Sequence, residues 1–528
     1  MAITTVAALV GVVLRFWPRS GMWLDEALTA NIASLPIGEI GEALRHDGHP
    51  PLFYLLLHWW MAIGGESDGW IRALPGVVSL ISLPLSYLAG VRLAGRSGAG
   101  PLGTRRTGLL AVAIMAVLPY GVRYGAEARM YSLTITLVLA GYLLVDDLLS
   151  GRSDGVRRLL CAGGVILVTA ALLWNHYWSM WLLAAVGLCA LWTAVKAREP
   201  RRRTGARLLV GGLVLGGVLF LPWMPSLMYQ SAHTGTPWGE RFGPASVVVI
   251  SIVDFAGARH GAAQLLSYLL VPLVLMATTV IIMSGTRPPG ATVTEPLVIT
   301  GRVLPRIRTE LLVMAMAMGV GWAAAFATDN TFASRYAAIV YPLFVLCVAA
   351  GIAVVRSSLA TSLLLVVVLT LSAFGAVGEI RSVRSQTDSI ADDIVTDVAA
   401  HDVDDAVVIA CPDQLGVALQ RQLDQRSDEA PTVVPYPSGG DPRFVDWVGY
   451  GARNKASDAQ AFVSELGDGL PADATVYLVS SSTYRTFEGK CEQLTAVLNQ
   501  GRVGTQLQSS KPDDHEEPAD LRVLRPAP

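Results

Sequence analysis

The chain has 528 residues, of which 52% are hydrophobic and only 16% are charged, and its mean hydropathy is +0.47. A soluble globular protein carries about a quarter charged residues, so this composition excludes an ordinary soluble domain and indicates an integral membrane protein. The formal net charge of −2 says nothing about nucleic acid, because the charges are segregated along the chain. We expect no nucleic-acid partner.

Apolar runs of membrane length recur from the N-terminus to about residue 380. A bilayer core of about 30 Å needs roughly 20 apolar residues per helix, so we predict an α-helical polytopic membrane domain over residues 1–380 with about eleven transmembrane helices. No small-residue cleavage site follows the short first run, so we expect a retained helix rather than a signal peptide, and leave open a start farther upstream. The runs are approximately 2–17, 71–94, 108–122, 131–149, 159–174, 178–196, 208–224, 265–283, 310–327, 337–355 and 358–379.

The loops between these runs alternate in basic charge. Arginines concentrate after the second, fourth, sixth, eighth and tenth runs, and the positive-inside rule places those loops in the cytoplasm. We therefore predict that the opposite loops, and the tail from about residue 380, face the periplasm or exterior of a bacterial plasma membrane. The arginines are Arg96, Arg105, Arg106, Arg152, Arg157, Arg158, Arg198, Arg201, Arg202, Arg203, Arg207, Arg287, Arg302, Arg306, Arg308 and Arg356. The acids of the opposite loops are Asp25, Glu26, Glu39, Glu42, Asp47, Glu127, Asp254 and Asp329.

Ionisable residues gather in the segments predicted to face outward. Such groups are costly near a bilayer and are usually functional. Both signs recur on this face: carboxylates that can accept a proton, and arginines that can hold a phosphate through two parallel hydrogen bonds. The segments are WLDEAL (23–28), HDGHPPLFY (46–54), RYGAEARMY (123–131), TDNTFASRY (328–336) and, more weakly, the tight turn WNHYW (174–178).

Each of these motifs alone also has a structural interpretation. The pair Asp25-Glu26 could cap the helix that follows, because acidic residues are favoured in a first turn. Pro50 and Pro51 could simply break the chain before a helix. The other polar candidates could pack, pair with other loops or extend to the interface: His49, His176, Glu127, Arg129 and Arg335.

Together the segments suit one reaction, the transfer of a sugar from a lipid phosphate to an acceptor hydroxyl. The acceptor needs a general base within hydrogen-bond reach. The departing phosphate gains negative charge and needs fixed cationic donors. In a single displacement, the base and the cations lie on opposite sides of the sugar, an arrangement that separate loops can supply.

Four stretches occur in a defined order: WLDEA from residue 23, HPPLFYLLLHWW from residue 49, RYGAEARMYSL from residue 123 and SRYAAIVYPLF from residue 334. Their combination resembles the GT-C superfamily of polytopic glycosyltransferases, in the branch that contains protein O-mannosyltransferases and the lipid A aminoarabinose transferase. The resemblance covers roughly residues 1–380. It implies a polyprenyl-phosphate sugar as donor, inversion at the anomeric carbon and no nucleotide sugar at the active site.

The resemblance also implies roles for individual residues. In this branch the acidic residue of the first outward loop is the catalytic base, which is Asp25 here, with Glu26 beside it in support. Arg129 and Arg335 would contact the donor phosphate. From the same segments we assign to donor or substrate binding the residues Glu127, Tyr124, His49, Tyr336 and His176.

Metal dependence, sugar and acceptor stay open at this stage. Some relatives carry an acidic residue or lysine just before the proline pair, whereas this chain has Gly48-His49. Asp47, His49 and His176 could hold a divalent cation or orient the acceptor, although the proposed chemistry requires no metal. The Ala-, Val-, Gly- and Arg-rich sequence indicates a GC-rich bacterium such as an actinobacterium, where decaprenyl-phosphate mannose and arabinose feed the synthesis of envelope glycans. We favour mannose slightly over arabinose, with a glycan, glycolipid or protein hydroxyl as acceptor.

Residues 381–528 are more polar and predict a small α/β domain. Strands are expected over 404–412 and 474–482, each followed by a helix. In an oxidising exterior Cys411 and Cys491 would form a disulfide, whereas Cys161, Cys189 and Cys347 lie in apolar runs and are expected to be inert. The domain could be a lid or a carbohydrate-binding module. Its aromatic candidates for sugar stacking, most of which are better explained by core packing, are Tyr436, Trp447, Tyr450 and Tyr484.

Two further expectations concern the end of the chain and the alternative functions. The last segment, from residue 509, is predicted to be mostly disordered, although LRVL could add an edge strand. A transporter or flippase of lipid-linked glycans is a second function class. Against it, the charges cluster in outward loops and no inverted repeat is visible. A third class is a non-catalytic scaffold that binds glycans.

Overall fold

The structure is a computed structural model, and it describes residues 1–527 except 19, 97, 153, 236–241, 258–260, 283–299, 304–306, 329–330, 356, 402, 404, 428, 468–469, 472 and 483–487. The side chains of residues 262, 277–282 and 300–303 are also outside the description. Several residues singled out in the sequence therefore fall outside the described residues: Arg287, Arg306, Asp329, Arg356, Tyr484 and the side chain of Arg302.

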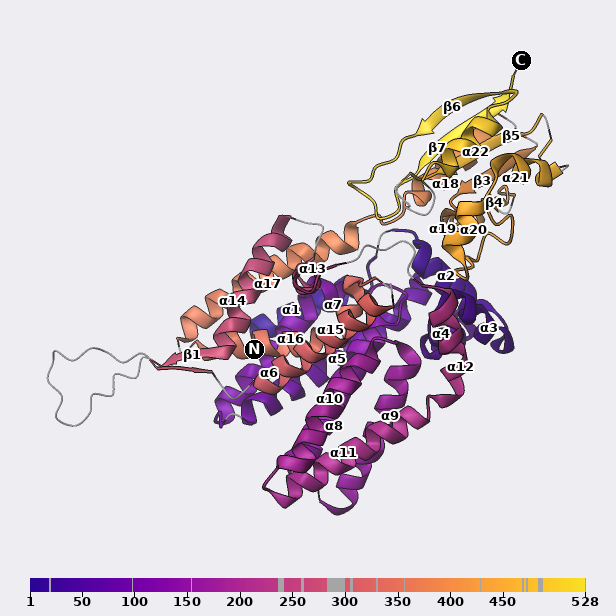
Figure 1. The fold of residues 1–528 in the computed structure, drawn as a ribbon. Coiled ribbons are helices and arrows are strands. Elements are labelled where there is room, and N and C mark those ends of the chain that lie inside the picture. The colour runs from indigo at the N-terminus through magenta and orange to yellow at the C-terminus, as the bar shows by residue number, and fades with distance from the viewer. Residues whose placement is uncertain are drawn as a thin grey trace, which may run out of the picture.

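Apolar helices form a bundle over residues 2–381 (Figure 1). In the described part of the chain, seven helical segments are long and apolar enough to cross a membrane. They are α5 (Asp68–Gly95), α8 (Tyr131–Leu149), α9 (Gly155–Asn175), α10 (Ser179–Lys196), the segment Pro200–His233 that begins with α11 (Pro200–Val218), α15 (Arg308–Ala327) and α17 (Ser358–Arg381).

The other four predicted runs also overlap helices, each of 14 to 18 residues, that are not among these seven. They are α1 (Ala2–Arg15), α6 (Pro101–Val117), α14 (Gly261–Thr278) and α16 (Tyr341–Val354). The predicted polytopic helical fold is confirmed, and the chain is a multi-pass membrane protein.

Close helix contacts explain several of the glycines in the bundle. A Cβ added at Gly90 of α5 would lie 2.9 Å from the carbonyl oxygen of Thr107 in α6. A Cβ at Gly351 of α16 would lie 1.9 Å from the carbonyl oxygen of Leu273 in α14. Small residues at such crossings let membrane helices approach closely, so these positions set the spacing of the bundle.

The eighth predicted run ends earlier than expected. Helix α14 ends at Thr278, and the chain continues as β1 (Thr279–Ile282), which pairs antiparallel with β2 (Thr300–Val303). The run of β-branched residues at 278–282 favours extended backbone, which explains why the apolar pattern there does not continue as a helix.

Loops predicted to share one side of the membrane contact one another. At the end of the bundle away from the C-terminal domain, Arg96 in the loop after the second run contacts Glu310, the first residue after the loop that follows the eighth run. At the other end, Arg123 contacts Asp254 at 3.8 Å. The alternation in charge along the sequence therefore corresponds to two separate polar ends of the bundle.

Short helices fill the end of the bundle that adjoins the C-terminal domain (Figure 1). Pro51 precedes the apolar helix that carries the LLLHWW motif, where the Trp60 ring stacks on Trp70 with centroids 4.6 Å apart. These elements are α2 (Leu24–Ser34), α3 (Ile37–Asp47), α4 (Leu52–Gly64), α7 (Pro119–Arg123), η1 (Leu221–Trp223), α12 (Met224–His233), α13 (Pro244–Phe255) and η2 (Ser334–Ile339).

The C-terminal part contains a five-stranded sheet of order β4-β3-β5-β7-β6. Strand β3 is parallel to β4 and β5, and β7 is antiparallel to β5 and β6. The predicted small α/β domain is confirmed. Its elements are α18 (Thr387–His401), β3 (Ala406–Cys411), α19 (Gln414–Asp424), β4 (Val433–Pro435), α20 (Tyr450–Ala456), α21 (Ala459–Leu466), β5 (Thr475–Ser480), α22 (Lys490–Leu498), β6 (Arg502–Gln508) and β7 (Asp520–Pro526).

The end of the chain differs from its prediction as a mostly disordered segment. Residues 520–526 form β7, which lies inside the sheet between β5 and β6 rather than at its edge. Leu521, Val523 and Leu524 are fully buried. This strand is short and is preceded by a charged stretch, so its apolar pattern alone gave little indication of a central position.

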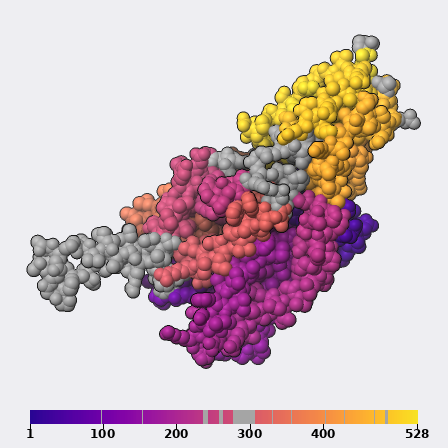
Figure 2. All heavy atoms as spheres, in the orientation of Figure 1, coloured from indigo at the N-terminus to yellow at the C-terminus, as the bar shows by residue number. Residues whose placement is uncertain are grey.

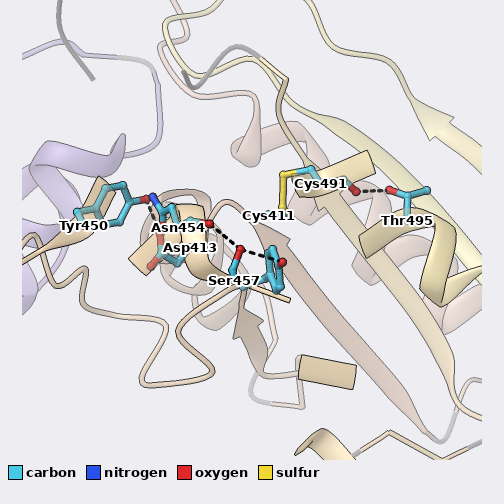
Figure 3. The surroundings of a disulfide bond; sticks show 8 residues. Cys411, Asp413, Tyr450, Asn454, Ser457, Cys491 and Thr495 are labelled. Atoms are coloured by element: carbon cyan, nitrogen blue, oxygen red, sulfur yellow. Dashed lines mark hydrogen bonds between the residues drawn. A yellow bond between two sulfur atoms is a disulfide. The ribbon is translucent and has the colours of Figure 1, made fainter. Parts of the chain in front are cut away.

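Cys411 at the end of β3 and Cys491 in α22 form a disulfide, with their Cα atoms 5.7 Å apart (Figure 3). In the same region Tyr450 donates a hydrogen bond to Asp413 at 2.6 Å. Tyr436 and Tyr450 are almost completely buried, and Tyr450 also packs on Trp447 with ring centroids 4.8 Å apart. These aromatic residues serve the domain core, as the packing interpretation expected.

The C-terminal domain rests on the end of the bundle that holds the short helices, beside α2 and α3 (Figures 1 and 2). Arg421 of α19 contacts Asp68 at 2.7 Å. His46 at the end of α3 contacts Asp446 at 2.9 Å, and its carbonyl accepts a hydrogen bond from the Trp447 amide. The domain is thus fixed to the short helices that carry the candidate site.

Candidate active site

Asp25 lies in the first turn of α2, close to two arginines from distant parts of the chain. Its Oδ2 atom accepts a hydrogen bond from Arg335 of η2 at 3.0 Å and lies 3.7 Å from Nη2 of Arg129. The Asp25 backbone carbonyl also accepts a hydrogen bond from Arg129 at 3.2 Å. The Arg129 side chain is only 3% exposed, while those of Asp25 and Arg335 are 17% and 21% exposed.

The arginines determine the charge of Asp25. Burial alone would raise the pKa of its carboxyl group, but the positive charges of Arg129 and Arg335 hold that pKa below its ordinary value. Asp25 is therefore an ionised carboxylate at neutral pH, which is the form that can accept a proton.

The contact differs in one respect from the sequence prediction, which put a sugar between the base and the arginines. In the structure the Asp25 carboxylate and the Arg335 guanidinium touch directly. Opposite charges attract strongly where water is scarce, which explains the direct contact. The distance between the Asp25 carboxylate and the Arg335 guanidinium cannot be read from the sequence.

His49 and Asp47 extend the cluster behind Arg129. Nη2 of Arg129 lies 3.1 Å from Nε2 of His49. Because a guanidinium can only donate, Nε2 must accept, and the proton of a neutral His49 ring then sits on Nδ1. That nitrogen donates to Oδ2 of Asp47 at 2.9 Å, and the Tyr54 hydroxyl donates to the same oxygen at 2.8 Å. The chain of contacts fixes the orientation of the Arg129 side chain.

This arrangement does not fit the divalent cation considered for Asp47 and His49. Both ring nitrogens of His49 are engaged, and the nearest group beyond Nε2 is a cation, Arg129. Among the described residues, no group of three or more His, Cys, Asp or Glu side chains is arranged to hold a metal ion. We therefore derive no chemistry through a metal.

Glu26 faces away from Asp25 and forms a buried ion pair with Arg72. Its two carboxylate oxygens accept hydrogen bonds from Arg72 at 2.8 and 2.5 Å, and its side chain is 1% exposed. Oε1 also accepts the backbone N–H of Ala128 at 2.9 Å. Glu26 thus supports the loop that presents Arg129 and does not itself reach the Asp25 cluster.

Glu127 and Tyr124 belong to a neighbouring polar cluster rather than to the one around Asp25. Glu127 contacts Arg384 and lies 3.5 Å from Arg123. The ring of Tyr124 lies under the Arg123 guanidinium and packs edge-on against Tyr120, with ring centroids 4.5 Å apart. The structure does not bring these two sequence-predicted residues to Asp25.

His176 and Tyr336 form the aromatic side of the site. Their rings lie 5.7 Å apart, and Tyr336 stacks on Trp178 at 5.2 Å. His176 is 3% exposed, and its Nδ1 atom has no hydrogen-bond partner among the described residues. Burial, with the nearby positive charges, lowers the pKa of His176 to about 3, so the ring is neutral. Tyr336 follows Arg335 directly, so this packing orients the arginine.

Comparison with solved structures identifies the architecture. ArnT from Cupriavidus metallidurans in the apo state superimposes with a TM-score of 0.56 at 13% sequence identity, over 99% of this chain and 97% of that chain. The structure of that protein bound to undecaprenyl phosphate gives a TM-score of 0.55, with the same identity and coverage. The fold is GT-C-like.

At this level of identity the likeness concerns the GT-C-like fold and not the activity. An oligosaccharyltransferase of Archaeoglobus fulgidus, in complex with Zn and sulfate, gives a TM-score of 0.47 at 11% identity, over 97% of this chain and 72% of that chain. That similarity is too low to carry an argument. No protein-family model and no curated protein matches the sequence.

Several residues that build this site in the GT-C-like chain were not predicted. Arg72 lies at the start of the second predicted span, at the end predicted to face outward, where a search for a cation to pair with Glu26 could have found it. Thr29 accepts a hydrogen bond from Arg129 at 2.9 Å and lies one helical turn after Asp25. Glu517, which contacts the backbone at Leu24, had no signal in the sequence because it lies in the last polar stretch.

Proposed function

We propose that the protein is an inverting glycosyltransferase that moves a sugar from a polyprenyl-phosphate donor to an acceptor hydroxyl outside the cytoplasm. The sugar is mannose in preference to arabinose, and the acceptor is a glycan, glycolipid or protein of a bacterial cell envelope. The active site and the C-terminal domain face the periplasm or exterior of the plasma membrane.

One observation carries this proposal: the ionised Asp25 carboxylate adjoins Arg129 and Arg335 at one polar end of a membrane bundle. A general base and two phosphate-binding cations are the groups that the reaction needs. Further support comes from the GT-C-like fold and from the neighbour ArnT, whose structure was also determined with undecaprenyl phosphate bound.

In the proposed reaction, the acceptor oxygen attacks the anomeric carbon from the face opposite the lipid phosphate. Its proton passes to Asp25 as the new glycosidic bond forms. The bond between the anomeric carbon and the phosphate oxygen breaks, and polyprenyl phosphate leaves with the electron pair. Arg129 and Arg335 hold the phosphate and stabilise its added charge, and the sugar is transferred with inversion.

The donor phosphate must compete with Asp25 for Arg335. Arg335 has a long, partly exposed side chain, which allows its guanidinium to turn from the carboxylate to a phosphate. Arg129, whose Nη2 atom lies 3.7 Å from Asp25, must also move part of the way from the carboxylate to the phosphate. The sugar would then enter between Asp25 and the phosphate, as the displacement requires.

The decisive experiment supplies labelled decaprenyl-phosphate mannose or decaprenyl-phosphate arabinose to membranes that contain the protein or its Asp25→Asn variant. We expect one label to move to an acceptor only with the parent protein. The substitution removes the base with little change in volume, so the rate should fall by roughly 100-fold or more while donor binding persists. The exposed residue Glu39 on α3 provides the matched control, and Glu39→Gln should leave the rate unchanged.

The same experiment separates the alternative functions. A transporter or flippase would carry the labelled lipid across the membrane and would form no new glycosidic bond. A glycan-binding scaffold would retain label without turnover. Either result, or full activity of Asp25→Asn, would refute the proposed transferase.

A further inference from the structure

Helix α2, which carries Asp25, has no capping side chain of its own. Its N-cap residue is Trp23, which provides no side-chain acceptor for the first amides of the helix. The amide N–H of Leu24 donates instead to the carboxyl group of Glu517, at 3.1 Å to Oε1 and 3.3 Å to Oε2. Glu517 lies between β6 and β7, so the C-terminal domain provides the hydrogen-bond acceptor that caps the N-terminus of α2.

The backbone holds Glu517 firmly in this place. The amides of Glu516 and Glu517 donate to the carbonyl of Arg384 at 2.8 and 3.0 Å, and the amide of Gln386 donates to the carbonyl of Glu517 at 3.0 Å. Glu517 is only 2% exposed. The backbone of Glu517 is therefore fixed against the segment that links α17 to α18, and its side chain extends from there toward α2.

Glu517 caps the helix mainly as a neutral acid at pH 7. Burial raises its pKa to about 8, and the nearby Asp25 and Glu26 carboxylates act in the same direction. The hydroxyl of Ser385 and the amide of Leu24 oppose that rise. A neutral carboxyl group still accepts the Leu24 hydrogen bond through its carbonyl oxygen, and it adds no second negative charge beside the base.

The hydrogen bond reaches the backbone immediately before Asp25. On the other side, the Asp25 carbonyl is held by Arg129 at 3.2 Å and by the Thr29 hydroxyl at 2.6 Å. The backbone around the base is thus fixed from both directions. Loss of the cap would loosen the first turn of α2, where a small displacement moves the carboxylate relative to Arg335.

We propose that Glu517 is a positioning residue through which the C-terminal domain fixes the Asp25 carboxylate for transfer. This inference rests on the proposed function. It gives the C-terminal domain a direct part in the activity, beyond that of a lid or spacer.

Kinetics of Glu517→Ala and Glu517→Gln, with labelled decaprenyl-phosphate mannose or arabinose as donor, test the proposal. For Glu517→Ala we expect kcat to fall roughly tenfold to 100-fold, with the donor KM changed less than about threefold, because Asp25 is misplaced while the phosphate contacts remain. Glu517→Gln keeps a neutral acceptor of equal size and should restore most of kcat at pH 7.

The neighbouring Glu516 provides a matched control. It comes from the same loop but contacts Arg123 at 3.0 Å rather than α2, so Glu516→Gln should leave kcat within about twofold. A loss of kcat in Glu516→Gln equal to that in Glu517→Ala, or an unchanged kcat in Glu517→Ala, would overturn the positioning role.

Amide hydrogen exchange tests the cap without relying on activity. We expect faster exchange over residues 22–30 in Glu517→Ala, with little change in Glu517→Gln or Glu516→Gln. Unchanged exchange in Glu517→Ala would refute the inference even if the parent protein is an active transferase. Conversely, a parent that transfers neither sugar would refute the proposed function, and exchange would still decide whether Glu517 caps α2.

Discussion

Asp25 owes its ionised form to two arginines, and this dependence predicts a change in pH profile. In Arg335→Gln one of the charges that lower the pKa of Asp25 is lost, so that pKa rises. A general base works only when deprotonated, so the rate falls as pH drops through its pKa. We expect the acid limb of kcat/KM to move to higher pH in this variant, which lowers the ratio of the rates at pH 5 and pH 7.

The conservative variant Arg335→Lys separates charge from geometry. Lysine keeps the positive charge but cannot hold a phosphate with two parallel hydrogen bonds. Its acid limb should stay close to that of the parent, while its donor KM rises. An unshifted acid limb in Arg335→Gln would show that Asp25 is not the base that limits the rate at low pH.

The buried pair Glu26–Arg72 predicts a loss of stability. Removing Arg72 leaves the Glu26 carboxylate uncompensated where its side chain is 1% exposed, which costs about 3–5 kcal/mol. We expect Arg72→Leu to lower the thermal unfolding temperature in detergent substantially. The double variant Glu26→Leu with Arg72→Leu should regain part of that loss, because no lone charge remains.

A surface residue at the same end of the bundle provides a comparison for the stability of Arg72→Leu. Glu42 is largely exposed and pairs with Arg45 at 3.2 Å, so Glu42→Ala should change stability by less than about 1 kcal/mol. Equal effects of Arg72→Leu and Glu42→Ala would contradict the view that the buried pair supports the Arg129 loop.

The sequence identified the ionisable residues of the site more readily than their partners. Asp25, His49, Arg129 and Arg335 stood out because charges are rare near a membrane and these four recur on one side. Their contacts could not be predicted, since they depend on how loops about 100 to 300 residues apart meet. For the same reason the sequence alone groups Glu127 with the substrate-binding residues, although it lies in the neighbouring cluster of Arg123.

At the scale of helices and turns, Gly48 determines the path of the backbone from α3 to His49. It ends α3 with a φ of +90°, a left-handed conformation that costs other residues about 1–2 kcal/mol. A Cβ there would also lie 3.2 Å from Oγ1 of Thr234. We expect Gly48→Ala to destabilise the protein by this amount and to reduce the transfer rate, because His49 would shift from Arg129.

Gly489 provides a control in the same left-handed conformation. It precedes α22 with a φ of +76°, and a Cβ there would meet no atom within 4 Å. Gly489→Ala should therefore reduce stability by a similar amount, as measured by thermal unfolding, while the transfer rate per folded molecule is unchanged. If both variants lose activity equally, the position of His49 does not matter to the reaction.

The elements themselves differ in how well the sequence predicted them. Long apolar helices such as α5, α8 and α17 follow from length and composition alone. Short elements that depend on tertiary contacts, such as η2 and the inner strand β7, carry no comparable signal. The strand β7 is central because β5 and β6 supply partners on both sides, and those partners are invisible in its own sequence.

At the scale of the whole molecule, the proposed chemistry depends on which end of the bundle faces outward. The two polar ends are distinct: Glu39 lies on α3 beside the C-terminal domain, and Arg201 lies at the start of α11 near Asp154 at the opposite end. The arginine-rich end should be cytoplasmic under the positive-inside rule. The end with Asp25 would then meet acceptors outside the cell.

Cysteine labelling tests this orientation directly. Cys161, Cys189 and Cys347 are not disulfide-bonded and can be replaced, while the Cys411–Cys491 disulfide stays in place. A membrane-impermeant maleimide should label Glu39→Cys in intact cells, but should label Arg201→Cys only after the membrane is permeabilised, because Arg201 lies at the arginine-rich end. The reverse pattern would put Asp25 and the C-terminal domain in the cytosol. An extracytoplasmic acceptor would then be ruled out, whatever the geometry of the site.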